Sequence, residues 1–164
     1  MHSGTKYAIL NKKGRERRMK TILVSRCLFG VPCRYDGASC PYPGIDALSK
    51  RFTVVTVCPE CDGGLPVPRP AGERRGGRVV TKDGADLTAY YVRGAEATLK
   101  VARASGATIA LLKSRSPSCG VGLIHDGTFS GGMTDGDGVT AQLLKENGIR
   151  VYTENDLAKL LAEN

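Results

Sequence analysis

The chain has 164 residues, of which 41% are hydrophobic and 24% charged, and its formal net charge is +8. This length suits one domain, and the apolar content is sufficient for a buried core, which argues against an intrinsically disordered protein. No apolar run of about 18 residues occurs, and no apolar stretch typical of a secretory signal comes after the first charges. We therefore expect a cytoplasmic protein with no membrane contact.

The positive charge is concentrated at the start of the chain. Residues 1–20 carry seven basic and one acidic side chains, a net of +6, whereas residues 21–164 carry 17 basic and 15 acidic ones, a net of +2. The nearly neutral body argues against a nucleic-acid partner. We interpret residues 1–19 as a basic, mobile tail of vector-derived or alternative-start origin, and residues 20–164 as a single domain.

The first half of the chain predicts two buried strands joined by loops. Residues 21–25 and 52–57 are short, largely apolar runs with β-branched members, typical of buried strands. Residues 27–42, rich in Gly, Pro and Cys, predict a loop, and residues 44–51 predict a short helix. Glycines and prolines punctuate residues 58–77, which we expect to form a long loop.

The second half predicts helices that alternate with strands. The longest helix is expected to have Asp86 as its N-cap and Gly106 as its C-cap. The run from Thr153 to Asp156 resembles a capping box and predicts the start of the last helix. The remaining expected elements are an edge strand at 78–81, strands at 107–112 and 149–152, a Gly-rich loop at 113–138 and a helix at 139–147.

Mostly apolar strands that alternate with helices indicate a parallel sheet covered on both faces. We therefore predict an α/β fold with an open, mostly parallel sheet and helices on both faces, a Rossmann-like arrangement of three layers in a single domain. The sequence does not indicate an oligomeric state.

Cysteine is unusually frequent for a chain without a secretory signal. Such a set more often binds metal or performs chemistry than forms disulfides. Cys27 follows the first strand after one residue, Cys58 follows the second directly, and Cys119 lies in the loop that leaves the third. Because parallel sheets bind ligands at the carboxyl ends of their strands, we expect these three thiols to meet at one edge. The other three cysteines are Cys33, Cys40 and Cys61.

Three thiolates at a sheet edge have more than one interpretation. An iron–sulfur cluster held by three of them would keep one iron open to substrate. Zinc could be bound by three cysteines and water, or by four cysteines in a structural site, although the Cys58–Cys61 spacing has no second pair to match it. Buried structural thiols are the third alternative.

The remaining cysteines lie close to the same edge. Cys33 is a candidate for a fourth ligand or for a sulfur-accepting thiol. Cys40 and Cys61 are interpreted as bystanders.

Carboxylates and hydroxyls stand beside the expected thiol site. Glu60 lies two residues after a candidate ligand, where a carboxylate can hold or deprotonate water. Asp36, Ser116 and Ser118 lie within three residues of a cysteine, although such residues also bond their own backbone in turns. We treat all four as site candidates.

Several linked motifs occur in order along the chain. They are Cys27-Leu-Phe-Gly-Val-Pro-Cys33-Arg-Tyr-Asp-Gly37, then Cys58-Pro-Glu60 with Gly63-Gly-Leu-Pro-Val-Pro-Arg69, then Ser116-Pro-Ser-Cys-Gly120 with Asp126-Gly-Thr-Phe129. Together they resemble the bacterial thiouracil desulfurase family over about residues 20–162. Cys61 is not part of that family pattern.

The resemblance implies a cytoplasmic α/β enzyme that carries a [4Fe-4S] cluster. The positions that match its ligands are Cys27, Cys58 and Cys119. Glu60 and one serine of the Ser-Pro-Ser-Cys stretch, Ser118 or Ser116, match its catalytic neighbours.

We also expect Asp36 and Cys33 at the substrate, with Asp36 on the edge of the base. The implied reaction converts a thiolated nucleobase, such as 2-thiouracil, to its oxo form and hydrogen sulfide by non-redox, Lewis-acid hydrolysis. The alternatives are a non-catalytic zinc- or cluster-binding module and a thiol-based sulfur carrier.

Overall fold

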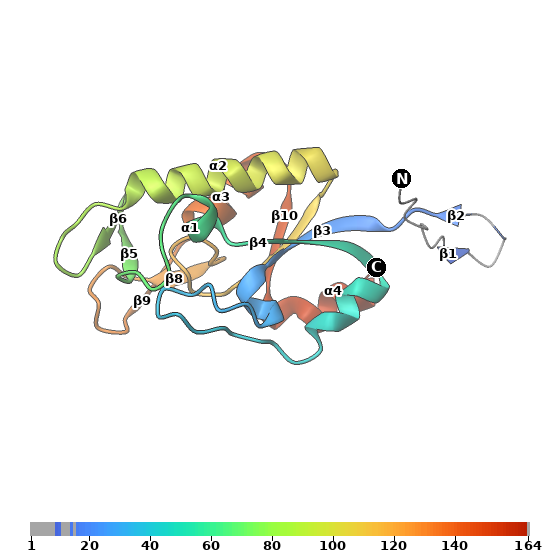
Figure 1. Ribbon diagram of the computed structural model, residues 1–164, viewed down its shortest axis with the longest axis horizontal. Helices are drawn as coiled ribbons and strands as arrows, with labels where there is room; N and C mark the ends of the chain where they lie inside the picture. Colours follow the sequence, from blue (N-terminus) through green and yellow to red (C-terminus); the bar gives the residue numbers. More distant parts are fainter. Residues whose placement is uncertain (1–8, 11–13, 15, 164) are drawn as a thin grey trace.

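A four-stranded parallel sheet forms the centre of the computed structural model, which describes residues 9–10, 14 and 16–163. The strand order is β10–β7–β3–β4 (Figure 1). The strands are β3 (Lys20–Ser25), β4 (Phe52–Val57), β7 (Ile109–Leu112) and β10 (Arg150–Thr153). The predicted open, parallel α/β sheet in a single domain is confirmed.

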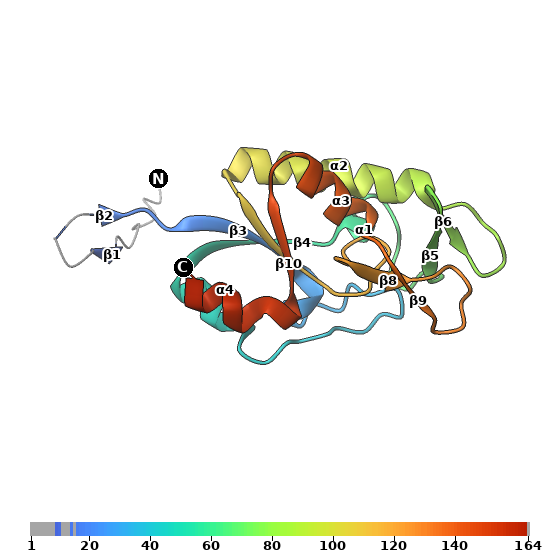
Figure 2. The ribbon, with the colours of Figure 1, turned by 180° about the vertical axis from the view of Figure 1, so that it is seen from behind.

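Helices cover both faces of this sheet, as predicted (Figures 1 and 2). One face carries α2 (Thr88–Ser105) and α3 (Val139–Glu146), with the short α1 (Pro59–Asp62) packed against α2. The opposite face carries the short helices η1 (Arg26–Phe29), η2 (Ile45–Lys50) and η3 (Glu154–Asp156), and α4 (Leu157–Glu163). No helix among the described residues has the length and apolar character to span a membrane.

Alternation along the central strands divides the core into two layers. Ile22 and Val24 on β3 join the core that contains Leu160 of α4, whereas Leu23 between them joins the core that contains Leu144 of α3. All five side chains are fully buried. The apolar run at 22–24 is therefore explained by a strand that is covered on both sides.

Two antiparallel hairpins lie beyond the carboxyl ends of the strands (Figure 1). The first pairs β5 (Gly72–Arg75) with β6 (Arg78–Thr81), so the strand predicted at 78–81 is present, and it belongs to a separate two-stranded sheet. The second pairs β8 (Leu123–His125) with β9 (Met133–Asp135), within the stretch expected to be loop. Strands of three or four residues between closely spaced glycines give little periodic signal.

The predicted helix ends are mostly reproduced. Gly106 is the left-handed C-cap of α2, and Thr153 forms a capping box with Asp156 at η3. Helix α2 begins at Thr88, with Leu87 as its N-cap, so Asp86 is not the cap itself. Its carboxylate still accepts the Thr88 N–H at 2.9 Å and satisfies one of the first free donors of the helix.

The start of the chain pairs only with itself in the described sheets. Strand β1 (Ile9–Leu10) is antiparallel to β2 (Glu16–Arg17), and the central sheet begins at Lys20. The rest of the expected tail, residues 1–8, 11–13 and 15, lies outside the described residues.

We expect that deleting residues 1–18 leaves the folded domain intact, because both cores are built from residues beyond them. The melting temperature should change by no more than about 2 °C, a shift of a few tenths of a kcal/mol. Thermal melting of the two proteins followed by circular dichroism checks this. A drop of about 10 °C would show that the segment is an integral part of the domain.

Candidate active site

The order of strands creates a crevice between β3 and β7. The chain runs outward from β3 to β4 in one direction and from β7 to β10 in the other. Ligands bind at the carboxyl ends of parallel strands where the winding reverses in this way. A cavity of about 440 Å³ lies there, a volume in the range of small-molecule sites.

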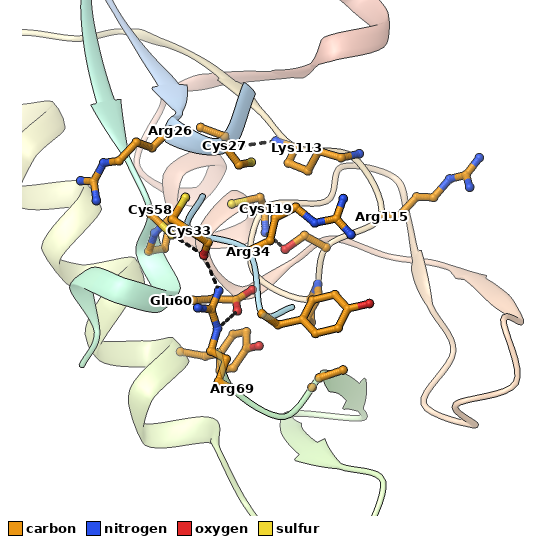
Figure 3. A pocket seen from close by; sticks show the side chains of 18 of the residues that line it. Arg26, Cys27, Cys33, Arg34, Cys58, Glu60, Arg69, Lys113, Arg115 and Cys119 are labelled. Atoms are coloured by element: carbon orange, nitrogen blue, oxygen red, sulfur yellow. Dashed lines mark hydrogen bonds and ion pairs between the residues drawn. The ribbon is translucent and has the colours of Figure 1, made fainter. Parts of the chain in front are cut away.

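Four cysteines line this cavity: Cys27, Cys33, Cys58 and Cys119. Each is 6–9% exposed, and the first, third and fourth come from three different strand ends (Figure 3). Cys27 is on η1 directly after β3, and Cys58 is the N-cap of α1 directly after β4. The structure therefore brings together the thiols that the strand positions place at one edge. Cys40 and Cys61 are not among the lining residues.

The loop that presents Cys119 is held by its own hydrogen bonds. Ser116 Oγ accepts the N–H groups of Ser118 and Cys119, at 3.1 and 3.0 Å. The carbonyls of Pro117 and Ser118 accept N–H groups from the first turn of α3. The loop thus satisfies N–H groups at the start of α3 that have no partner within the helix, and the same hydrogen bonds fix the backbone beside Cys119.

The segment that presents Cys58 is held by close packing of α1 on α2. Pro59 occupies the first position of α1, and the Cys58 N–H donates to Asp62 Oδ2 at 3.1 Å. On α2, the buried Gly94 faces the Pro59 carbonyl so closely that a Cβ would overlap its oxygen. Only glycine permits this approach of the two backbones.

We therefore expect Gly94→Ala to displace α1, and with it Cys58 and Glu60. The substitution should cost about 1–3 kcal/mol of stability by overpacking, despite the better helix propensity of alanine. Gly77→Ala is the matched control, because nothing lies within 4 Å of a Cβ at Gly77. Chemical denaturation measures both variants, and equal stabilities would contradict the close-packing argument.

Glu60 lines the cavity from α1 and forms an ion pair with the buried Arg69. Its Oε2 accepts the Nε–H of Arg69 at 2.7 Å, with only 14% and 3% of the two side chains exposed. Arg69 Nη2 also donates to the Cys33 carbonyl at 3.0 Å. Burial raises the pKa of Tyr91, which lines the same cavity, and the nearby Glu60 carboxylate adds to this rise. Arg69 therefore fixes the carboxylate relative to the cysteine loop.

Burial governs the protonation of the cavity thiols. It raises the pKa of Cys27 to about 11, with Cys40 and Cys58 adding to the rise and Lys113 opposing it. It likewise raises the pKa of Cys58 and Cys119. A positive metal centre would compensate the charge of these buried thiolates as it displaces their protons. The donor set therefore suits a thiolate-bound metal group.

The cavity lining contains more basic than acidic side chains. Its arginine and lysine residues are Arg26, Arg34, Arg69, Lys113 and Arg115, and its carboxylates are Glu60 and Glu73. Four of them are paired with carboxylates: Arg26 with Asp62, Arg34 with Asp36, Arg69 with Glu60 and Lys113 with Glu154. The lining therefore offers many N–H donors to an anion without a large net charge.

Lys113 is fixed by a residue from the fourth strand end. Its Nζ lies 2.6 Å from Oε1 of the buried Glu154, which also accepts the Ser114 N–H at 2.7 Å. Neither Lys113 nor Glu154 was among the predicted site residues. The signal was present, because each directly follows a strand, β7 or β10.

The two serine candidates occupy different environments. Ser116 lines the cavity. Ser118 does not line it, is fully buried, and its hydroxyl lies 2.9 Å from that of Thr140. Of the two candidates, Ser116 is therefore the one within reach of a bound molecule.

Asp36 is also placed outside the cavity lining. Its carboxylate pairs with the Arg34 guanidinium at 3.0 Å and accepts the Ala38 N–H at 3.0 Å. Those contacts lower its pKa, the Ala38 N–H most strongly. The expected contact of Asp36 with the base edge does not follow from this position, because a turn uses the carboxylate.

Comparison with known proteins agrees with the geometry of the site. A solved structure of a [4Fe-4S]-dependent thiouracil desulfidase, TudS, is 46% identical, with a TM-score of 0.83 over 88% of this chain and 97% of that one. The uncharacterized protein YbbK of Bacillus subtilis (strain 168) is 43% identical over 85% of this chain and 99% of its own length. The model of the 2-thiouracil desulfurase family matches residues 22–156. The chain therefore belongs to the 2-thiouracil desulfurase family.

Proposed function

We propose that this chain holds a [4Fe-4S] cluster on Cys27, Cys58 and Cys119 and removes sulfur from thiouracil. The observation that carries the proposal is one cavity, at the reversal of strand order, lined by cysteines from three strand ends and by Glu60. The solved relative with 46% identity, a [4Fe-4S]-dependent thiouracil desulfidase, supports the same cofactor and substrate.

The residues present suit this cofactor. Thiolates are the usual protein ligands of iron–sulfur clusters, and three cysteines from separate strand ends line the cavity. Among the described residues, no three His, Cys, Asp or Glu side chains lie close enough together to hold one metal ion. A four-iron cluster is a larger body, whose ligands lie farther apart than those of a zinc ion.

The proposed reaction exchanges one sulfur for one oxygen. Water adds to the thiocarbonyl carbon, the carbon–sulfur bond breaks, and 2-thiouracil becomes uracil and hydrogen sulfide without net electron transfer. When bound through three thiolates, the cluster supplies an iron with an open position, a Lewis acid for the soft thiocarbonyl sulfur.

The chain itself would supply proton transfer and orientation. Glu60, held by Arg69, accepts a proton from the attacking water as general base. Ser116 is close enough to the cavity to orient the ring or return a proton to the sulfur. Lys113, held by Glu154 in the cavity lining, donates to the anionic charge that develops on the departing sulfur.

The test is a metal and turnover analysis of anaerobically purified protein. We expect a brown protein with broad visible absorption, near four iron and four sulfide per chain, and equal amounts of uracil and sulfide from 2-thiouracil. A colourless protein with one zinc per chain would support the zinc-binding alternative. A full cluster without sulfide release would support the alternative of a non-catalytic cluster-binding module.

A further inference from the structure

Tyr35 is an exposed aromatic residue in the wall of the cavity. It is 43% exposed, although it lines the same cavity as the cysteines. The other tyrosine in the lining, Tyr91, is 1% exposed. Tyr35 therefore has ring surface available to a bound molecule, and Tyr91 has almost none.

The residues on either side of Tyr35 in the chain hold its segment in place. Arg34 N–H donates to the Ala38 carbonyl at 3.2 Å and closes a tight turn. Asp36 binds the Arg34 guanidinium through both oxygens, at 3.2 and 3.0 Å. That guanidinium lies 5.8 Å from the centroid of the Tyr35 ring, within the range of a cation–π contact. The ring is thus presented by an ordered turn.

Arg69 connects this turn to the carboxylate of the site. Its backbone N–H donates to the Tyr35 carbonyl at 2.8 Å, and its Nε–H donates to Glu60 at 2.7 Å. A single buried residue therefore ties the backbone of the exposed ring to the proposed general base. Preorganisation of this kind lowers the entropy lost when a ligand is positioned.

We propose that Tyr35 is the surface on which the heterocyclic ring of the substrate stacks, and that it selects flat ring thiocarbonyls. The inference rests on the proposed function, since it assigns the ring of that substrate to a specific side chain. Aromatic side chains stack on nucleobases with little dependence on base identity, because every base has a π face. The thiocarbonyl would then be presented to the cysteine side of the cavity.

The experiment compares Tyr35→Ala and Tyr35→Phe in cluster-loaded protein. Tyr35→Ala should raise the KM for 2-thiouracil, and the Kd for uracil measured by equilibrium dialysis, by about 5- to 100-fold. Tyr35→Phe should keep both within about twofold, because it retains the ring. The kcat of Tyr35→Phe should stay within about threefold of wild type, since the ring, Glu60 and the cysteines are all retained.

Tyr90→Ala is the matched control. Tyr90 is 37% exposed and has an Arg93 guanidinium 4.9 Å from its ring centroid, yet it does not line the cavity. Three results would overturn the assignment: unchanged uracil binding by Tyr35→Ala, equal losses in Tyr35→Phe and Tyr35→Ala, or equal losses in Tyr90→Ala. Failure of the proposed function would give a different result. Wild-type protein with a full cluster would then release no sulfide, whereas uracil binding would still show whether Tyr35 contacts the ring.

Discussion

Replacing Cys119 by alanine is expected to abolish cluster binding and sulfide release together. Cys119 is 6% exposed and lines the cavity from a loop anchored by Ser116 and the start of α3. Loss of an outer partner of a metal ligand already costs about 10- to 100-fold in affinity, so loss of the ligand itself should cost more. Iron content and visible absorbance after anaerobic reconstitution measure the effect.

Cys27→Ala and Cys58→Ala should behave in the same way, and Cys40→Ala supplies the control. Cys40 is partly buried beside the same core but does not line the cavity, so its variant should keep a full cluster. Thermal melting of the cluster-free proteins distinguishes loss of a ligand from loss of the fold. A single substitution typically lowers the free energy of unfolding by about 1 kcal/mol. Full iron in Cys119→Ala, or equal loss in Cys40→Ala, would contradict the assigned ligand set.

The thiol part of the site is the part that the sequence predicts best. The apolar runs at 21–25 and 52–57 place the ends of β3 and β4, and the structure ends them at Ser25 and Val57. The positions of Cys27 and Cys58 are then set by strand direction alone, because residues that come after parallel strands lie at one edge of the sheet. Local pattern is sufficient where a ligand directly follows a strand.

Polar side chains in loops could not be placed in the same way. Ser118 bonds Thr140, which lies 22 residues further along the chain, and Asp36 is used by Arg34. Asp36 is held within its own turn by residues two positions away, whereas the direction of the Ser118 hydroxyl depends on a tertiary partner. Arg69 is a similar case, since its contacts with Glu60 and Cys33 form only when the Pro-rich loop folds back.

Glu60 has a geometry suited to a base that must remain in position. It sits in α1 two residues after Cys58, and Arg69 holds one oxygen at 2.7 Å. Arg69 keeps three further acceptors: the carbonyls of Cys33 and Pro66 and the Cys61 sulfur. A glutamine at position 60 would retain an oxygen for Arg69 but could no longer accept a proton from water. The substitution therefore separates proton transfer from positioning.

We expect Glu60→Gln to keep a full cluster and a normal affinity for uracil, while kcat falls by about 10²- to 10⁴-fold, the usual contribution of a positioned general base. Glu73→Gln is the matched control, because Glu73 is a buried carboxylate of the same lining that accepts the Phe129 N–H at 3.1 Å. Its kcat should change less than about tenfold, because the proposed reaction assigns proton transfer to Glu60. Cluster absorbance is recorded beside steady-state sulfide release. Near-normal turnover with a full cluster would remove Glu60 from the mechanism, and loss of the cluster would make Glu60 structural or a ligand.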